Sequence, residues 1–312
     1  MSLINLICFI SLLVLLPFVS IGLIRKVKAR FQNRVGPPIF QALFNTIKLL
    51  RKTETVSQET SWIFRASALI NFAVVLILAF LVPWSPIHFN MGINDIFLII
   101  YLFALYRFFT VIGSLDGGSA FSTFGASREI TLGILIEPSI VLSIVALGVY
   151  AHTSNLNQIF LHSGQPRHFT DVLLWMFAGA GLFLSSLVEL SRMPIDDPTT
   201  HLELTMVHEA MILENSGPNF ALIEMAYILR LVILYGLAAQ CFLHGMMHFV
   251  ELNFVGMFIL SILLILTLAV LTAIIESFAV KLAWRNNPNF IAYSLTMSLL
   301  ASLSAIVVGV IG

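Results

Sequence analysis

Carboxylates and arginines occur inside several long apolar runs of this sequence, where a charge surrounded by lipid is costly. Glu137 lies about two turns inside one such run, and Arg230 lies about a third to half of the way along another. Ionisable side chains in such places are functional candidates by default. A low dielectric disfavours an ionised carboxylate, and a neighbouring arginine favours it. The two residues therefore indicate either a proton relay or a structural ion pair.

Other charged residues stand closer to the ends of the apolar runs. Arg107, Glu189 and Glu276 lie near predicted span ends, where a side chain can reach the membrane surface and be solvated there. For these three, a functional and a structural role stay equally open. Arg128 and Glu129 mark the predicted start of the fourth span, and Glu224 lies in the sixth.

The most distinctive segment runs from Glu189 to Pro218. Asp197 followed by Pro198 is typical of a helix start, and Gly217-Pro218 is typical of a helix stop. This pattern predicts a helix from residue 198 to about 214. Eleven residues at about 100° each would place Glu203 and Glu214 on one face. His201 and His208 would share a roughly opposite face, and Asp196 immediately precedes the helix.

Three interpretations of this acidic segment compete. It could be an ordered loop that docks a partner and lines a polar cavity with Glu203 and Glu214. It could be a metal site built from His201 and His208 with nearby carboxylates. It could also be a solvated loop without a role. His208-Glu209 is not followed by a second histidine four residues on, so the zinc-protease motif is absent. The positive-inside rule does not explain acidic residues, which favours the first interpretation.

The composition defines the setting of these groups. Of 312 residues, 59% are hydrophobic and 10% are charged, and the mean hydropathy is +0.98. The apolar runs are about twenty residues long, enough to cross a bilayer core. The sequence predicts an all-α polytopic membrane protein with one integral-membrane domain, 1–312, and about eight transmembrane helices. The predicted spans lie near 3–24, 62–83, 94–113, 130–151, 170–190, 220–243, 252–275 and 289–311. The zero net charge argues against nucleic acid as a partner.

Lysine and arginine placement predicts the orientation. Basic residues concentrate in the loops at about 25–61, 114–129, 191–219 and 276–288, which are therefore predicted to be cytoplasmic. Both termini are predicted on the opposite side of a bacterial or archaeal inner membrane. Met1 is followed almost at once by an apolar run without a basic leader, which predicts a retained first span.

One part of the first basic loop has helical periodicity. Ile39, Leu43, Ile47 and Leu50 recur at helical spacing between Pro38 and Arg51. This pattern favours a short amphipathic helix at the cytoplasmic interface over an ordinary basic linker.

The chain offers no ligand set for a redox centre. Cys8 and Cys241 are its two cysteines, both within apolar runs. Two isolated thiols cannot build a cysteine-ligated iron–sulfur cluster or a structural zinc site. Any electrons in the reaction that this protein serves are therefore expected to travel on other subunits.

Three segments carry a family resemblance. The acidic segment, with Pro194-Ile-Asp196, Glu203-Leu and Glu214-Asn-Ser-Gly217, resembles the acidic loop of complex I subunit 1. The segment from Arg30 through Lys48 resembles that family's first cytoplasmic loop and interfacial helix. Gly125-Ala-Ser-Arg128-Glu129 with Glu137 resembles its third-loop motif. The resemblance covers nearly the whole chain, in the right order and topology.

Within this family the hydrogenase branch fits better. Arg107-Phe-Phe, Leu115-Asp116-Gly-Gly, Leu135-Ile-Glu137-Pro138, the basic Arg230 and Glu276-Ser-Phe-Ala look like hydrogenase-4 and formate hydrogenlyase membrane subunits. There are departures: Thr199, Thr200 and His201 stand where the family usually carries further glutamates, and Glu224 lies one turn before the usual glutamate position.

The resemblance implies a non-catalytic membrane subunit of an oxidoreductase complex. It would dock the large and small hydrogenase subunits, which carry the nickel–iron and iron–sulfur centres, and adjoin antiporter-like membrane subunits. The chain would bind no cofactor or metal itself, while a bound quinone stays open. The docking loop would contain Arg25, Arg30, Arg34 and Lys48. The polar path for proton coupling would contain Arg128, Glu129, Glu137, Glu189, Asp196, Glu203, Glu214 and Arg230.

Two other hypotheses remain beside the hydrogenase one. A quinone-site subunit of an NADH dehydrogenase predicts a fuller set of loop glutamates and a quinone tunnel beside the first-loop arginines. A stand-alone carrier of ions or solutes is disfavoured, because the sequence has neither an inverted repeat nor signals of broken helices.

Overall fold

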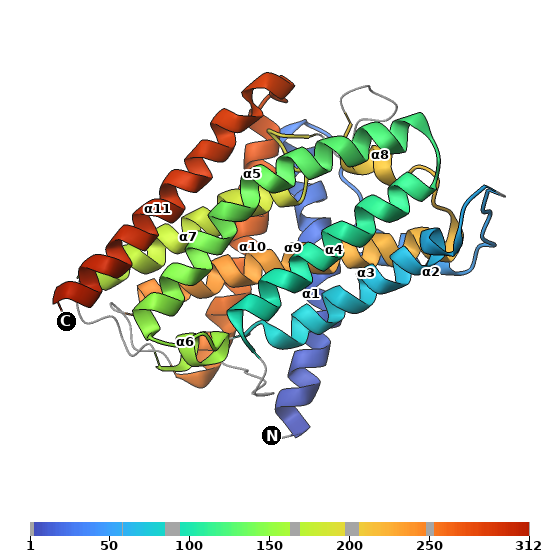
Figure 1. Cartoon of the computed structure of the whole chain (residues 1–312). Helices are drawn as coiled ribbons and strands as arrows, with labels where there is room; N and C mark the ends of the chain where they lie inside the picture. Colours follow the sequence, from blue (N-terminus) through green and yellow to red (C-terminus); the bar gives the residue numbers. More distant parts are fainter. Residues whose placement is uncertain are drawn as a thin grey trace.

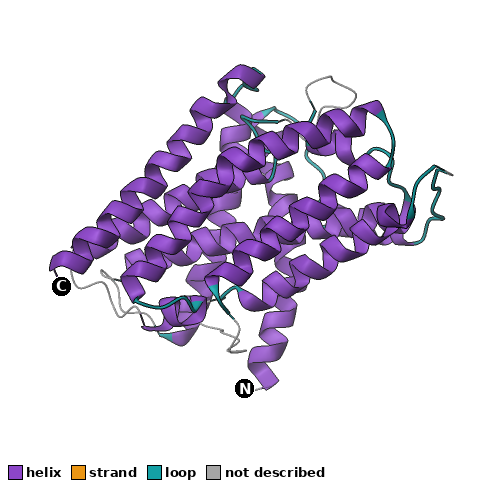
Figure 2. Ribbon diagram, in the orientation of Figure 1, coloured by secondary structure: helices purple, strands orange, loops and turns teal. Residues whose placement is uncertain are grey.

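The protein is a bundle of long helices in a computed structural model, which describes residues 3–57, 59–84, 94–162, 169–196, 206–247 and 253–311. Figures 1 and 2 show that the elements of these ranges are helical, as the composition predicts. The α-helices are α1 Leu3–Phe31, α2 Gln41–Leu50, α3 Trp62–Leu81, α4 Ile96–Asp116, α5 Ala120–Ala151, α6 Leu156–His162, α7 Phe169–Glu189, α8 His208–Ile212, α9 Gly217–Met246, α10 Phe254–Phe278 and α11 Asn287–Ile311, with a 3₁₀ turn, η1, at Trp284–Asn286.

The predicted membrane spans are confirmed as helices. Seven helices of the described ranges, α3, α4, α5, α7, α9, α10 and α11, are long and apolar enough to cross a bilayer. The first predicted span, 3–24, coincides with the 29-residue α1. In Figure 1 both chain ends and α6 lie at the lower end of the bundle, whereas α2 and α8 lie away from it. This arrangement agrees with alternating loops on two sides; which side faces the cytoplasm stays a prediction.

Helices α7 and α9 form the centre of the bundle. Both are largely buried within the chain, and each packs against several neighbours. Trp175 of α7 and Tyr235 of α9 are among the largest fully buried side chains. Helix α3 packs against α9, α4 packs against α3 and α5, and α5 and α11 pack against α7.

A seam of buried serines joins α5, α7 and α11. Ser139 Oγ lies 2.7 Å from Ser294 Oγ and 2.6 Å from Ser298 Oγ, and Ser185 Oγ lies 2.7 Å from Ser294 Oγ. Small hydroxyl side chains let helix backbones approach closely in lipid and supply hydrogen bonds between helices. The seam holds α5 against α7, which fixes the position of two candidate carboxylates.

Helix α5 begins earlier than the sequence analysis predicts. The loop expected at 114–129 is confined to the turn between Asp116 and Ala120, and Arg128 and Glu129 lie within the helix. Ser119 caps the helix, because its Oγ accepts the Ser122 N–H at 3.2 Å. Hydropathy alone misplaced this boundary, since the polar first turns of α5 continue the helix beyond its apolar run.

Asp116 in the same turn has a structural role. Its Oδ2 accepts the backbone N–H groups of Ser61 at 2.9 Å and Phe64 at 3.1 Å. Both donors belong to the start of α3, where amide groups have no partner within the helix and a carboxylate is favoured. The aspartate of the Leu115-Asp116-Gly-Gly motif therefore joins α4 to α3.

The acidic segment differs from its prediction where it can be described. Helix α8 spans His208–Ile212, so the helix predicted over 198 to about 214 is confirmed for these five residues and is wrong at 206 and 207, where the chain is not helical. Asp197, Pro198, His201 and Glu203 lie outside the described residues. Gly217-Pro218 starts α9 rather than stopping a helix, with Pro218 in its first turn. Proline fits there because the first amide groups of a helix need no donor within it.

The interfacial helix prediction is confirmed by α2. This ten-residue helix packs against α9 through its buried Ala42 and Thr46. Phe40, Phe44 and Ile47 stay exposed at helical spacing. An exposed apolar stripe on a short helix beside membrane spans suits the boundary between lipid head groups and tails.

Candidate functional site

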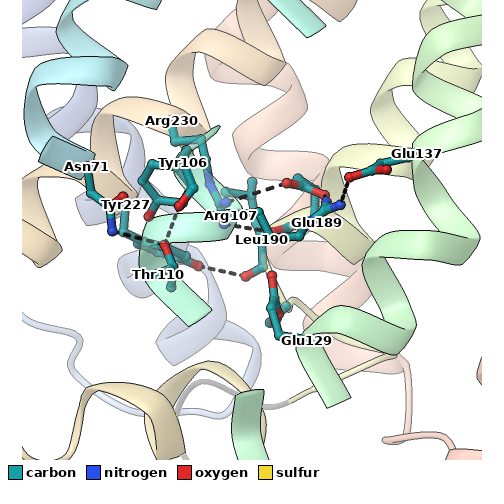
Figure 3. Close-up of polar contacts among 11 residues, drawn as sticks. Asn71, Tyr106, Arg107, Thr110, Glu129, Glu137, Glu189, Leu190, Tyr227 and Arg230 are labelled. Carbon is teal, nitrogen blue, oxygen red and sulfur yellow. Dashed lines mark hydrogen bonds and ion pairs between the residues drawn. The ribbon is translucent and has the colours of Figure 1, made fainter. Parts of the chain in front are cut away.

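Arg107 lies midway along α4 and joins two other helices. Its Nη1 pairs with Glu137 of α5, and its Nη2 pairs with Glu189 at the end of α7. Figure 3 shows the guanidinium between the two carboxylates. The arginine side chain is 11% exposed. It is therefore a structural bridge inside the bundle, and the prediction that Arg107 could reach the membrane surface is wrong.

Arg230 of α9 contacts the same carboxylate from the other side. Its Nη1 lies 3.5 Å from Glu189 Oε1, and its Nη2 donates to the Glu189 backbone carbonyl at 2.7 Å. The guanidinium carbon lies 4.4 Å from the ring centroid of Tyr106, a cation–π distance. Glu189 is thus held by two arginines from two helices, both largely buried.

Glu129 completes the group and forms no ion pair with another of the described residues. Its residue is 6% exposed, and Ser191 Oγ donates to its Oε2 at 3.4 Å. Figure 3 places Glu129 below the Arg107–Glu189 pair. We call Arg107, Glu129, Glu137, Glu189 and Arg230 the central network. It combines three carboxyl groups with two guanidinium groups.

Gly133 determines the path of Arg107 across α5. A Cβ at this position would lie 2.5 Å from Arg107 Nη1, 2.6 Å from Cζ and 2.8 Å from Nε. Real Cβ atoms do not approach other atoms this closely, so any other residue would move the guanidinium. The glycine of the Thr131-Leu-Gly133 step therefore opens the route by which Arg107 reaches both Glu137 and Glu189.

A second group of charges lies beyond the end of α7. Glu276 of α10 pairs with Lys28 of α1 at 3.4 Å and with Arg192 at 3.0 Å. Asp196 accepts from Lys281 Nζ at 2.7 Å and from the Val207 N–H at 2.9 Å. We call these five charged residues, Lys28, Arg192, Asp196, Glu276 and Lys281, the distal cluster. The prediction that Glu276 could reach the surface is wrong, because the residue is 5% exposed.

A cavity of about 100 Å³ lies beside the distal cluster. Its walls include Ile24 and Arg25 of α1, Glu224 and Tyr227 of α9, and His208 of α8. His208 stacks on Tyr227 with ring centroids 4.8 Å apart. Desolvation by burial, together with the nearby charges of Arg230 and Arg192, lowers the pKa of His208 to about 3. The imidazole is therefore neutral at pH 7.

The remaining residues predicted for the polar path and the metal site do not all join the central network. Glu137 and Arg230 do not pair with each other; each takes its partner from elsewhere in the central network. Glu214 is exposed in this chain and lies beside Gly117 at the end of α4, and its place on the polar path stays a prediction. Glu203 and His201 lie outside the described residues. The described ranges contain no group of three His, Cys, Asp or Glu side chains placed to hold a metal.

The basic residues expected to dock a partner lie on the surface. Arg25, Arg30, Arg34 and Lys48 are exposed on α1, on the turn after it and on α2. Arg128 points elsewhere: its Nη1 donates to the carbonyl of Met206, within the acidic segment, at 3.1 Å. Arg128 therefore holds that segment rather than joining the central network.

Comparison with known proteins identifies the family. The sequence profile of the family described as NADH dehydrogenase matches residues 4–308. The chain belongs to this family. Hydrogenase-4 component C of Escherichia coli (strain K12) is 32% identical over 237 residues, covering 75% of this chain and 73% of the relative. Formate hydrogenlyase subunit 4 of the same strain is 28% identical over 215 residues, covering 68% of each chain.

Complex I proteins are also similar to this member of the family. An NADH-quinone oxidoreductase subunit of Rubrobacter xylanophilus is 30% identical over 241 residues, covering 71% of this chain and 68% of the relative. A chain of the membrane-bound sulfane sulfur reductase, an archaeal respiratory membrane complex, has the same fold, with a TM-score of 0.80 at 17% identity over 96% of this chain and 98% of that one. The chain is thus a membrane subunit of the kind found in complex I-like respiratory complexes.

Proposed function

We propose that this chain is the membrane-anchor and proton-coupling subunit of a complex I-like membrane-bound nickel–iron hydrogenase of the hydrogenase-4 or formate hydrogenlyase type. It would dock soluble large and small hydrogenase subunits, which carry the nickel–iron and iron–sulfur centres, and adjoin antiporter-like membrane subunits. The chain itself would carry out no electron chemistry. The similarity to hydrogenase-4 component C and formate hydrogenlyase subunit 4 supports this choice of complex.

The observation that carries the coupling role is the central network. It joins α4, α5, α7 and α9 through charged side chains within membrane-spanning helices. In a low dielectric, three carboxylates beside two guanidiniums would leave one negative charge without a counterion, which is strongly unfavourable. Within the described residues Glu129 has a serine hydroxyl as its partner and no ion pair. We therefore place an exchangeable proton on the central network, with Glu129 as its holder.

This arrangement suits a proton relay that responds to a structural change in the segment after α7. Ser191, the partner of Glu129, directly precedes Arg192 of the distal cluster. A shift of the segment after α7 would alter the Glu129 hydrogen bond and the Arg192–Glu276 pair together. Redox events on a docked subunit could thereby change which carboxyl group holds the proton.

The test compares neutral substitutions in the complete complex. Glu129→Gln and Glu137→Gln should leave assembly intact and impair proton translocation linked to hydrogen evolution in inverted membrane vesicles. Glutamine has the shape of a protonated glutamate, so Glu129→Gln should also leave thermal stability unchanged. Glu214→Gln is the matched control, because Glu214 is exposed and should keep normal coupling. Normal translocation in Glu129→Gln would remove Glu129 from the relay.

The similarity to an NADH-quinone oxidoreductase subunit supports a second candidate function, that of a quinone-site subunit of an NADH:quinone oxidoreductase, with the cavity as the candidate site. Isoleucines of α1 and α9 line it together with several charged side chains, among them Arg25, Arg192, Glu224 and Glu276. Its volume of about 100 Å³ is below that of most small-molecule sites, about 300–1,000 Å³. Purified complex with tightly bound quinone, which added inhibitors of quinone reduction displace, would favour this function.

A further inference from the structure

The Glu137 carboxylate is charged and yet lies on the outer surface of the bundle. Its side chain is 48% exposed, whereas its partner Arg107 is 11% exposed. Glu137 lies seven residues, about 10 Å at 1.5 Å per residue, inside the apolar run of α5 that begins near residue 130. Neither end of the helix brings so short a side chain to water. A half-exposed carboxylate at this depth would face lipid tails, which is expensive.

A second acceptor lies on the same surface. Pro138 has no N–H, so the carbonyl of Ile134 lacks its usual donor within α5. Ile134 is 66% exposed, and Pro138 is exposed beside Glu137. Unsatisfied carbonyl groups in the hydrocarbon region cost several kcal/mol by order of magnitude, so they occur where protein covers them. The surface thus presents two acceptors one turn apart.

The groups around these acceptors are apolar. Leu135 of α5 is 39% exposed next to Ile134. One oxygen of Glu137 pairs with Arg107, and the other has no partner among the described residues. We call the Glu137 carboxylate and the Ile134 carbonyl, with Leu135 and Pro138 of the same helix, the acceptor patch.

We propose that the acceptor patch is the binding surface for a membrane-spanning helix of another subunit, which places a hydrogen-bond donor side chain against Glu137. A hydroxyl, an amide or a basic group on that helix would satisfy the free carboxylate oxygen and the Ile134 carbonyl together. Lipid tails supply no donor at this depth. Hydrogen bonds between helices are a recognised part of helix association in membranes.

A second copy of this chain fits the acceptor patch poorly. In a two-fold dimer the same surface meets itself. The acceptor patch would then meet a second acceptor patch, which contributes no donor side chain. Two carboxylates and two carbonyls without donors would be left in a low dielectric. The complementary partner is therefore a different polypeptide. This inference rests on the proposed function only in that the chain works inside a multi-subunit membrane complex.

The experiment is site-directed photocrosslinking in native membranes, with a photoreactive amino acid at Ile134 in the tagged chain. The expected product, isolated from the purified complex, joins this chain to a different integral-membrane subunit, and mass spectrometry maps the bond to a predicted spanning helix with a donor side chain nearby. A product with twice the mass of this chain, or reaction with lipid alone, would overturn the proposal.

Two variants of Glu137 test whether the partner helix donates a hydrogen bond to this residue. Glu137→Gln keeps an acceptor oxygen and should keep the crosslink yield at Ile134. Glu137→Leu has a similar size, removes the acceptor, and should lower that yield at least threefold. Equal yields in both variants would overturn the role of the hydrogen bond. The outcome does not depend on the kind of complex: a crosslinked partner without nickel would contradict the proposed function and leave this inference standing.

Discussion

Substitution of Gly133 by alanine tests whether the central network depends on the position of the Arg107 guanidinium. The added Cβ would lie 2.5–2.8 Å from three guanidinium atoms of Arg107, against an ordinary contact of about 3.5–4.0 Å. The guanidinium must therefore move by roughly 1 Å, which separates it from Glu137 and Glu189. Removing one partner of a buried pair costs about 3–5 kcal/mol, which is an upper limit here because every partner stays in place, and the better helix propensity of alanine returns about 1 kcal/mol. The expected net loss of stability is therefore at most about 2–4 kcal/mol.

Gly245→Ala is the matched control for this substitution. Gly245 is also inside a helix, but its Cβ would meet Met176 Sδ at 3.4 Å, an ordinary contact. Gly245→Ala should be neutral or stabilising. The assay is thermal unfolding of the purified complex in mild detergent, with proton translocation as a second readout.

A double-mutant cycle shows whether Arg107 carries the effect. In an Arg107→Ala background the space beside Gly133 is empty, so Gly133→Ala should cost nothing further and should gain the helix propensity of alanine. Contacts within one network are expected to be non-additive in this way. If Gly133→Ala destabilises the Arg107→Ala protein as much as the wild type, the clash does not act through Arg107 and the derived geometry is wrong.

Three further predictions concern the distal cluster and the docking surface. Glu276→Gln leaves the buried Arg192 without its counterion and should destabilise the chain by about 3–5 kcal/mol; a loss below about 1 kcal/mol would show that the pair is unimportant. The folded-state pKa of His208 is depressed to about 3, so between pH 6.5 and 3 only the unfolded chain binds this proton. The free energy of unfolding therefore decreases as the pH is lowered through this range, by up to about 1.4 kcal/mol per pH unit. His208→Phe should remove that part of the slope in unfolding experiments at pH 7 and 5, and an unchanged slope would refute it. Charge reversal of Arg30 and Arg34 together should release the soluble subunits from washed membranes, and retained subunits would exclude this loop as the dock.

Spans were predictable from the sequence because length and hydropathy decide them. The interfacial α2 was also predictable from its periodicity. The start of α5 was not, because an apolar window ends where polar residues begin, whereas the helix continues to the cap at Ser119. A capping serine after Gly117-Gly118 was the available signal for that boundary.

Which charged side chains form ion pairs with one another was harder to predict from the sequence. Sequence marks Arg107, Glu189 and Glu276 as charged residues near predicted span ends, but a pair between α4 and α7 depends on how tilted helices cross. Gly133 offered a weak signal, a small residue one turn before Glu137 on the same helix. The sequence also did not separate buried carboxylates from exposed ones: Asp196 and Glu189 lie in buried polar surroundings, whereas Glu214 is exposed.

The most direct test of the proposed function is purification of the tagged chain from its native membrane in mild detergent, followed by analysis of what accompanies it. Hydrogenase subunits, nickel, iron–sulfur centres and hydrogen evolution from a reduced dye should be recovered in one complex with this chain. Recovery of flavin and quinone-reductase activity without nickel would contradict the hydrogenase assignment and favour the quinone-site function.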